Sequence, residues 1–164
     1  MVSERTLRLV SAAIAVAGIC VAVYITIADS GGGAPACLAG GSGCQTVADS
    51  QYSHLLGVNV AVFGIVGYVL LLTSALVRGD AGRFAGLVVA LIGFGFSAYL
   101  TYLELFVIDA ICQWCVVSAG LMALLLIVNA ARAIAYAGAE LAAGEGSGSN
   151  QNGHGAEVQQ RLAR

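Results

Sequence analysis

Charged residues are scarce in this sequence. Only 10% of the 164 residues are charged, whereas a soluble domain usually carries about 25%. Apolar residues make up 59% of the chain, and the mean hydropathy is +0.90. This composition argues against a soluble globular domain and predicts an integral membrane protein.

Lysine is absent, and all seven basic residues are arginines. They form no basic patch of the kind that binds nucleic acid. The sequence also lacks a metal-ligand cluster and a glycine-rich dinucleotide fingerprint. We therefore expect no nucleic-acid partner and no metal site, and any redox chemistry needs another electron acceptor.

Four apolar runs have about the length that crosses the hydrocarbon core of a bilayer. They predict an all-α membrane domain over residues 1–136, built as a bundle of four transmembrane helices. A polar, glycine-rich loop carrying two cysteines separates the first two runs, and its residues 45–54 predict a short interfacial helix. Residues 137–164 are of low complexity and predict a disordered tail. The expected spans are residues 9–28, 58–77, 84–106 and 112–136.

Arginine placement predicts the orientation. With four spans, every arginine falls on the side that holds both termini and the middle turn, which the positive-inside rule places in the cytoplasm. The glycine-rich loop and the 107–111 connection then face outward from the plasma membrane, where disulfides persist. The arginines are Arg5, Arg8, Arg78, Arg83, Arg132, Arg161 and Arg164.

Two cysteine pairs share that outer side. Cys112 and Cys115 form a Cys-x-x-Cys motif where the fourth span begins, and a helix N-terminus favours a thiolate. Cys37 and Cys44 lie in the loop. We predict that the two pairs meet and exchange electrons through a mixed disulfide. Without a metal or dinucleotide, a lipid-soluble quinone is the natural final acceptor, and an outer thiol protein is the donor.

The sequence resembles the vitamin K epoxide reductase family in its prokaryotic form, over roughly residues 18–121. The loop pair, a serine after it and the late Cys-x-x-Cys together carry the resemblance. The matching residues are Tyr24, Cys37, Cys44, Ser50, Gly57, Phe63, Gly64, Tyr68, the run 97–106, Cys112-Gln113-Trp114-Cys115 and Ser118.

The resemblance implies a four-helix bundle around a quinone of the menaquinone or ubiquinone type. It implies that Cys115 acts on the quinone ring and that Cys112 exchanges with the loop pair. The prokaryotic pattern makes Cys44 the residue that meets the outer partner and Cys37 the residue that attacks Cys112. Many prokaryotic members carry a thioredoxin-like domain fused after the bundle. The tail of this sequence is too short and too polar for such a domain, so we expect a separate thioredoxin-like or DsbA-like protein as the donor.

Alternatives remain beside this quinone-linked thiol oxidoreductase. Reduction of vitamin K epoxide is disfavoured, because Ala119 stands where vertebrate enzymes carry a tyrosine. A disulfide generator of the DsbB type is disfavoured by motif order, since its Cys-x-x-Cys lies in the first outer loop. A non-catalytic membrane scaffold with structural disulfides is the third alternative.

Further residues are candidates for quinone binding, each with a structural alternative. Asn59 is a candidate through the resemblance, with Val60 as the alternative register. Ser50 either caps the short helix or bonds near the thiols, and His54 is a surface residue or a proton donor. Glu104 is expected at the membrane interface. Phe63, Tyr99 and Trp114 are pocket candidates that packing or interface anchoring also explains.

Overall fold

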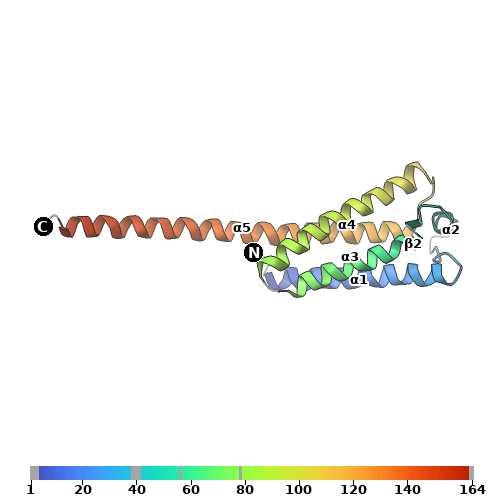
Figure 1. The fold of residues 1–164 in the computed structure, drawn as a ribbon, viewed down its shortest axis with the longest axis horizontal. Coiled ribbons are helices and arrows are strands. Elements are labelled where there is room, and N and C mark those ends of the chain that lie inside the picture. Colours follow the sequence, from blue (N-terminus) through green and yellow to red (C-terminus); the bar gives the residue numbers. More distant parts are fainter. Residues whose placement is uncertain (1–3, 38–41, 56, 78, 163–164) are drawn as a thin grey trace.

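The structure, a computed structural model, describes residues 4–37, 42–55, 57–77 and 79–162. Its long helices run side by side as a bundle (Figure 1). A short helix and a two-stranded antiparallel hairpin lie at one end of this bundle. The helices are α1 (Glu4–Ser30), α2 (Gly43–Ala48), α3 (Val60–Leu76), α4 (Asp80–Phe106) and α5 (Gln113–Leu162), and the strands are β1 (His54–Leu55) and β2 (Val58–Asn59).

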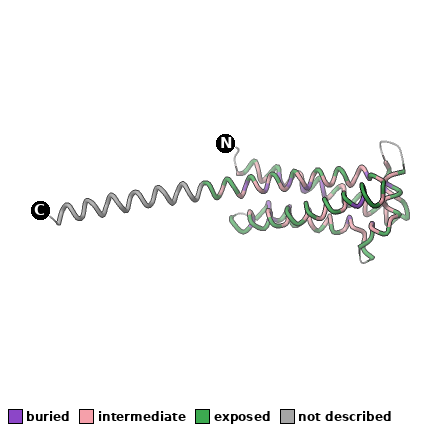
Figure 2. Tube along the Cα trace, turned by 90° about the horizontal axis from the view of Figure 1, so that it is seen from above, coloured by how far each residue is buried: buried purple, intermediate pink, exposed green. Residues whose placement is uncertain are grey.

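Three described helices are long and apolar enough to cross a membrane: α1, α4 and the 113–138 part of α5. α3 is also apolar, but its 17 residues lie at the lower end of the length that a span needs. Each predicted span overlaps one of these four helices, although residues 58–59 of the second span form β2 and residue 77 lies beyond α3. Many large apolar side chains on the outer surface are exposed, as expected for helices that face lipid (Figure 2). The prediction of a helical membrane protein is confirmed.

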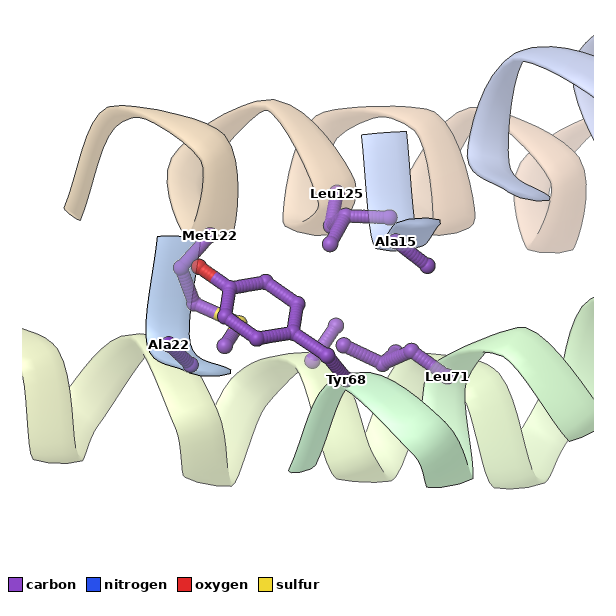
Figure 3. Close-up of a cluster of buried hydrophobic side chains, with 7 residues drawn as sticks. Ala15, Ala22, Tyr68, Leu71, Met122 and Leu125 are labelled. Carbon is purple, nitrogen blue, oxygen red and sulfur yellow. The ribbon is translucent and has the colours of Figure 1, made fainter. Parts of the chain in front are cut away.

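The bundle core forms around Tyr68, which is fully buried on α3 (Figure 3). Its ring lies against Gly18 of α1, where a Cβ would collide with the ring. Ala15, Gly18 and Ala22 recur at helical spacing, so α1 presents small residues that let α3 approach closely. The Tyr68 hydroxyl lies 2.9 Å from both the carbonyl oxygen and the Oγ of Ser118, which joins α3 to α5.

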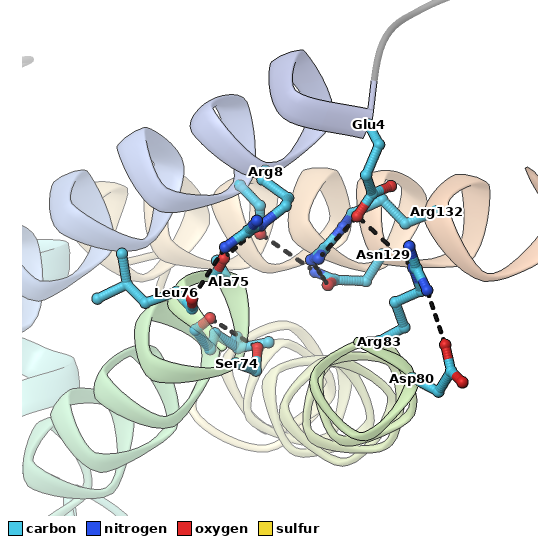
Figure 4. Close-up of polar contacts among 11 residues, drawn as sticks. Glu4, Arg8, Ser74, Ala75, Leu76, Asp80, Arg83, Asn129 and Arg132 are labelled. Carbon is cyan, nitrogen blue, oxygen red and sulfur yellow. Dashed lines mark hydrogen bonds and ion pairs between the residues drawn. The ribbon is translucent and has the colours of Figure 1, made fainter. Parts of the chain in front are cut away.

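Arginine side chains tie the helices together at the end of the bundle away from the hairpin (Figures 1 and 4). Arg8 donates to the carbonyl oxygens of Ala75 and Leu76 at the end of α3. Arg83 and Arg132 both lie against Glu4, at 3.6 and 3.4 Å. Arginines of α1, α4 and α5 therefore share one end, as the sequence predicted. Arg78 and Arg164 lie outside the described residues.

The predicted short helix over residues 45–54 is misplaced. α2 instead spans Gly43–Ala48, residues 49–53 turn, and His54 begins β1. A Cβ at Gly43 would collide with the Ile111 carbonyl oxygen, so glycine lets the start of α2 pack on the connection between α4 and α5. This distant contact sets the position of α2, and local sequence could not reveal it.

The structure continues α5 as helix over residues 137–162, and the predicted disorder of the tail stays a prediction. Residues 163–164 lie outside the described part of the chain. The sequence has a single proline, Pro35, so none interrupts this segment, and residues 137–143 are rich in alanine. Alanine has the highest helix propensity, and helical hydrogen bonds are local.

Candidate functional site

The two cysteine pairs differ in redox state in this structure. Cys37 and Cys44 form a disulfide with a Cα–Cα distance of 6.0 Å, whereas Cys112 and Cys115 are free thiols. Cys112 directly precedes α5, and its carbonyl oxygen accepts a hydrogen bond from Val116 N at 3.1 Å. The helix therefore begins at the Cys-x-x-Cys motif, as the sequence predicted.

The environment of Cys112 favours its thiolate. The main cause is a hydrogen bond from the Cys115 thiol, which lowers the pKa of Cys112 from 9.0 to about 7. Backbone N–H groups of Cys115 and Trp114 act in the same direction, whereas burial and the charge of Glu104 oppose it. The Cys112 thiolate is the form that takes part in thiol–disulfide exchange.

The loop pair reaches the helix pair through Cys44. This residue is only 2% exposed, lies on α2, and lines one cavity together with Cys112 and Cys115. Cys37 is half-buried, and its Sγ accepts a hydrogen bond from the Cys44 N–H at 3.3 Å. The resemblance implied that Cys37 faces Cys112. The burial favours the opposite order, with Cys44 facing inward and Cys37 closer to the surface.

Trp114 holds the start of the cysteine loop. Its Nε1 donates to the Ala36 carbonyl oxygen at 2.9 Å, and the Ala36 N–H donates to the Tyr24 hydroxyl at 3.1 Å. The two aromatic rings pack with centroids 4.9 Å apart. Trp114 therefore fixes the residue before Cys37, and it is not among the cavity-lining residues.

A second cavity adjoins the first and extends into the bundle between α1, α3, α4 and α5. The two share Glu104 and Cys115, so a sulfur lies where they meet. The second lining is mostly apolar, with Phe63 and Phe96 on facing helices and ring centroids 6.4 Å apart. The polar residues of its lining are Tyr68, Ser97, Thr101, Glu104 and Ser118. A mostly apolar cavity with a few polar groups is typical of small-molecule sites, and it suits a quinone ring.

Three of the six predicted quinone-binding residues line these cavities: Ser50 and Asn59 the first, and Phe63 the second. Ser50 donates from its hydroxyl to the Val47 carbonyl oxygen at 2.7 Å. Asn59 caps α3, because its side-chain oxygen accepts from the Ala61 N–H at 2.7 Å. These two residues therefore shape the loop and the helix start that enclose the first cavity.

The structure does not bring His54, Tyr99 or Trp114 to either lining. Tyr99 is 53% exposed on the outer face of α4. His54 lies at the surface, with Nε2 3.3 Å from an Asp29 carboxylate oxygen and Nδ1 2.9 Å from Ser53 Oγ. Asp29 does line the first cavity, so His54 reaches the site only through this partner.

Glu104 is a residue of this site that the sequence reasoning did not place here. It was expected at the interface but is only 5% exposed, and Oε2 accepts a hydrogen bond from the Cys112 N–H at 3.1 Å. Its carboxylate also hydrogen-bonds with the Cys115 thiol. A signal existed, because Ser97, Thr101 and Glu104 recur at spacings of four and three and thus share a helix face.

Comparison with known proteins agrees with this arrangement. The family model described as the vitamin K epoxide reductase family matches residues 9–130, which include α3, α4, most of α1, the first part of α5 and both cysteine pairs. No curated protein matches the chain. With a match over most of its length, this chain belongs to the vitamin K epoxide reductase family, whose members are membrane oxidoreductases.

Proposed function

We propose that the protein is a quinone-dependent thiol oxidoreductase that supports disulfide formation outside the cytoplasm. The observation that carries the proposal is the shared cavity. Cys44, Cys112 and Cys115 line it, and Cys115 also lines the adjoining apolar cavity. These three sulfur atoms connect the loop disulfide with a cavity that suits a quinone ring.

The electrons enter at the loop pair. A separate thioredoxin-like protein attacks Cys37, because this sulfur is the less buried of the two. That attack frees the Cys44 thiolate, which exchanges with Cys112 when the helix pair is a disulfide. The partner's second thiol then releases Cys37, whose thiolate attacks Cys44 and displaces Cys112. The loop disulfide is thereby re-formed and the helix pair is left reduced, which is the pairing in the structure.

The electrons leave through Cys115. A quinone of the menaquinone or ubiquinone type, when bound in the second cavity, supplies a two-electron acceptor. Phe63 and Phe96 provide apolar contacts for its ring, and Ser118 offers a hydroxyl near the sulfur. Asn59 and Ser50 act indirectly by closing the first cavity above it.

The proposal includes an orientation in the plasma membrane. All four long helices cross, with the arginine end in the cytoplasm and the cysteine end outside. Arginines of α1, α4 and α5 at one end of the bundle support this orientation, because they lie opposite the disulfide. With four crossings, both termini are cytoplasmic.

Quinol formation by the purified chain tests the proposal. The native chain, Cys115→Ala and Cys20→Ala receive dithiothreitol and a soluble quinone in detergent, and quinol is followed by absorbance. Cys20 is the matched control, because it is a free thiol exposed on α1 and lines neither cavity. We expect turnover by the native chain and Cys20→Ala, and loss of turnover in Cys115→Ala. A native chain that forms no quinol would favour a structural role for the cysteines.

A further inference from the structure

Glu104 is a buried carboxylate in contact with the reacting thiols. It lies in the last turns of α4 and lines both cavities. One oxygen is held 3.1 Å from the Cys112 backbone nitrogen, and the carboxylate also hydrogen-bonds with the Cys115 thiol. It is therefore fixed between the start of α5 and the sulfur proposed to face the quinone.

This carboxylate has no cation to offset its burial. Among the described residues, no basic side chain forms an ion pair with Glu104. Burying an unpaired carboxylate is costly, so the fold loses stability by placing one here. Uncompensated ionisable groups of this kind concentrate at functional sites, and within a membrane domain they often handle protons.

The proposed reaction needs such a group. Oxidation of two thiols to a disulfide releases two electrons and two protons, and reduction of a quinone to a quinol consumes two of each. Cys112 can lose its proton to water before the reaction, whereas Cys115 must give up its proton inside the cavity. The titratable groups that line the cavities beside Glu104 are the two helix cysteines, Asp29, Tyr52 and Tyr68. Of these groups, the Cys115 thiol hydrogen-bonds with Cys112 and with Glu104. The Cys112 sulfur cannot keep the proton, because it forms the new disulfide, and Glu104 lines both cavities whereas Cys112 lines only the first.

We propose that Glu104 is a catalytic residue that accepts the proton of the Cys115 thiol and delivers it to the reduced quinone. In this step the Cys112–Cys115 bond forms and the electron pair passes to the quinone. Glu104 supplies one quinol proton, and water supplies the other, which replaces the proton that Cys112 lost. Glu104 is a carboxylate at the start of the step and again at its end. This inference rests on the proposed function.

A purely structural role predicts a different outcome for one variant. Glu104 accepts from Cys112 N at the end of the connection that leads into α5, so it could serve only to hold this connection. Glu104→Gln separates the two roles, because an amide oxygen still accepts that hydrogen bond but the side chain no longer carries a proton. Glutamine therefore preserves the anchor and removes the proton transfer.

The experiment measures two steps in the native chain, Glu104→Gln and the control Asp49→Asn. Asp49 is an exposed carboxylate that lines neither cavity and accepts from Gln45. Oxidation of the reduced helix pair by a soluble quinone is followed by stopped flow from pH 5.5 to 8.5. Exchange from the reduced loop pair into the helix disulfide is followed by rapid alkylation.

For Glu104→Gln we expect quinone reduction to fall about 100-fold, the lower range for general acid–base catalysis. Relative to the native rate at the same pH, its rate should rise about tenfold per pH unit, because hydroxide must now remove the Cys115 proton while the ionisation of Cys112 affects both chains alike. Exchange between the pairs should stay within about threefold, and Asp49→Asn should match the native chain. A quinone rate and pH profile for Glu104→Gln equal to those of the native chain would overturn the proton role.

Two further results would have a different meaning from a normal rate in Glu104→Gln. A native chain that reduces no quinone contradicts the proposed function itself. If Glu104→Gln does not fold, Glu104→Asp provides the second test, because it retains a proton carrier that reaches less far. A rate for Glu104→Asp that falls at least tenfold, with a displaced pH profile, supports the inference. An unchanged rate and profile contradict it.

Discussion

The two ends of the bundle each bury a charged side chain, but they surround it differently. At one end, Arg132 is 1% exposed and lies between Glu4 of α1 and Asn129 of its own helix. At the other, Glu104 is 5% exposed and contacts a backbone N–H and a thiol. A buried charge with an opposite partner joins helices. A buried charge beside reactive sulfurs, without an ion-pair partner among the described residues, is placed for chemistry.

The comparison predicts that changes at the cysteine end remove activity and leave stability nearly intact. Cys112→Ser should abolish quinone reduction driven by a thioredoxin-like donor, because no exchange with the loop pair remains. The unfolding free energy should change by about 1 kcal/mol or less, since serine differs from cysteine by one atom. Quinol formation and thermal unfolding in detergent measure the two effects. Cys20→Ser should retain both properties, and comparable inactivation there would point to a global effect of cysteine loss.

The arginine end should respond in the opposite way. Glu4→Gln leaves Arg132 buried without its carboxylate, so we expect a loss of about 2 kcal/mol in unfolding free energy. This is below the 3–5 kcal/mol typical of fully buried pairs, because Glu4 is 39% exposed. Activity below the melting temperature should be unchanged. Asp80→Asn, which removes an exposed partner of Arg83, should cost at most about 1 kcal/mol. Equal costs for both variants would contradict the proposed difference between the ends.

The core between the two ends provides a packing test. Gly18→Ala places a methyl group against the Tyr68 ring, and we expect overpacking to cost about 1–3 kcal/mol. Gly95→Ala is the matched control, because a Cβ at Gly95 meets nothing within 4 Å. The control should gain up to about 1 kcal/mol from better helix propensity. Thermal unfolding measures both variants. If Gly18→Ala were as stable as Gly95→Ala, α1 and α3 would not meet at this contact.

The smallest predicted effect is a shift in the pH dependence of Cys112 alkylation. The pKa of this thiol is lowered to about 7, mainly by the hydrogen bond from Cys115. Alkylation requires the thiolate, so its rate at Cys112 should rise as the pH increases through about 7 and level off above it. In Cys115→Ala the midpoint should move up toward 9.0, the ordinary value. Mass spectrometry of iodoacetamide-treated protein gives both curves, and identical midpoints would exclude the thiol–thiol hydrogen bond as the cause.

The long helices could be predicted from sequence because hydrophobic run length is a local property. The position of the Cys-x-x-Cys motif at the start of α5 followed for the same reason. The position of α2 could not be predicted, since Gly43 packs on Ile111, which is distant in sequence. For the tail, the low-complexity composition predicts disorder, while the structure continues α5 to Leu162.

The site was predicted less completely than the fold. The four paired cysteines follow from spacing, but their order does not, because only the packing of α2 reveals that Cys44 is the buried member. Glu104 was missed because its burial depends on how the 107–112 connection folds back. Ile108 N donates to Leu103 O and Ala110 N donates to Glu104 O, which brings Cys112 N within 3.1 Å of the carboxylate. The turn requires Asp109 at a positive φ of 54°, which local sequence only weakly indicates.

The central claim is that Cys44 is the loop sulfur that exchanges with Cys112. The most direct measurement is trapping of the mixed disulfide. A chain carrying Cys37→Ser and Cys115→Ser has no sulfur to resolve this bond, so mild oxidation followed by peptide mass spectrometry should find a Cys44–Cys112 disulfide. The matched chain with Cys44→Ser and Cys115→Ser should form little Cys37–Cys112 disulfide. Preferential trapping of Cys37 with Cys112, or of neither pair, would contradict the account.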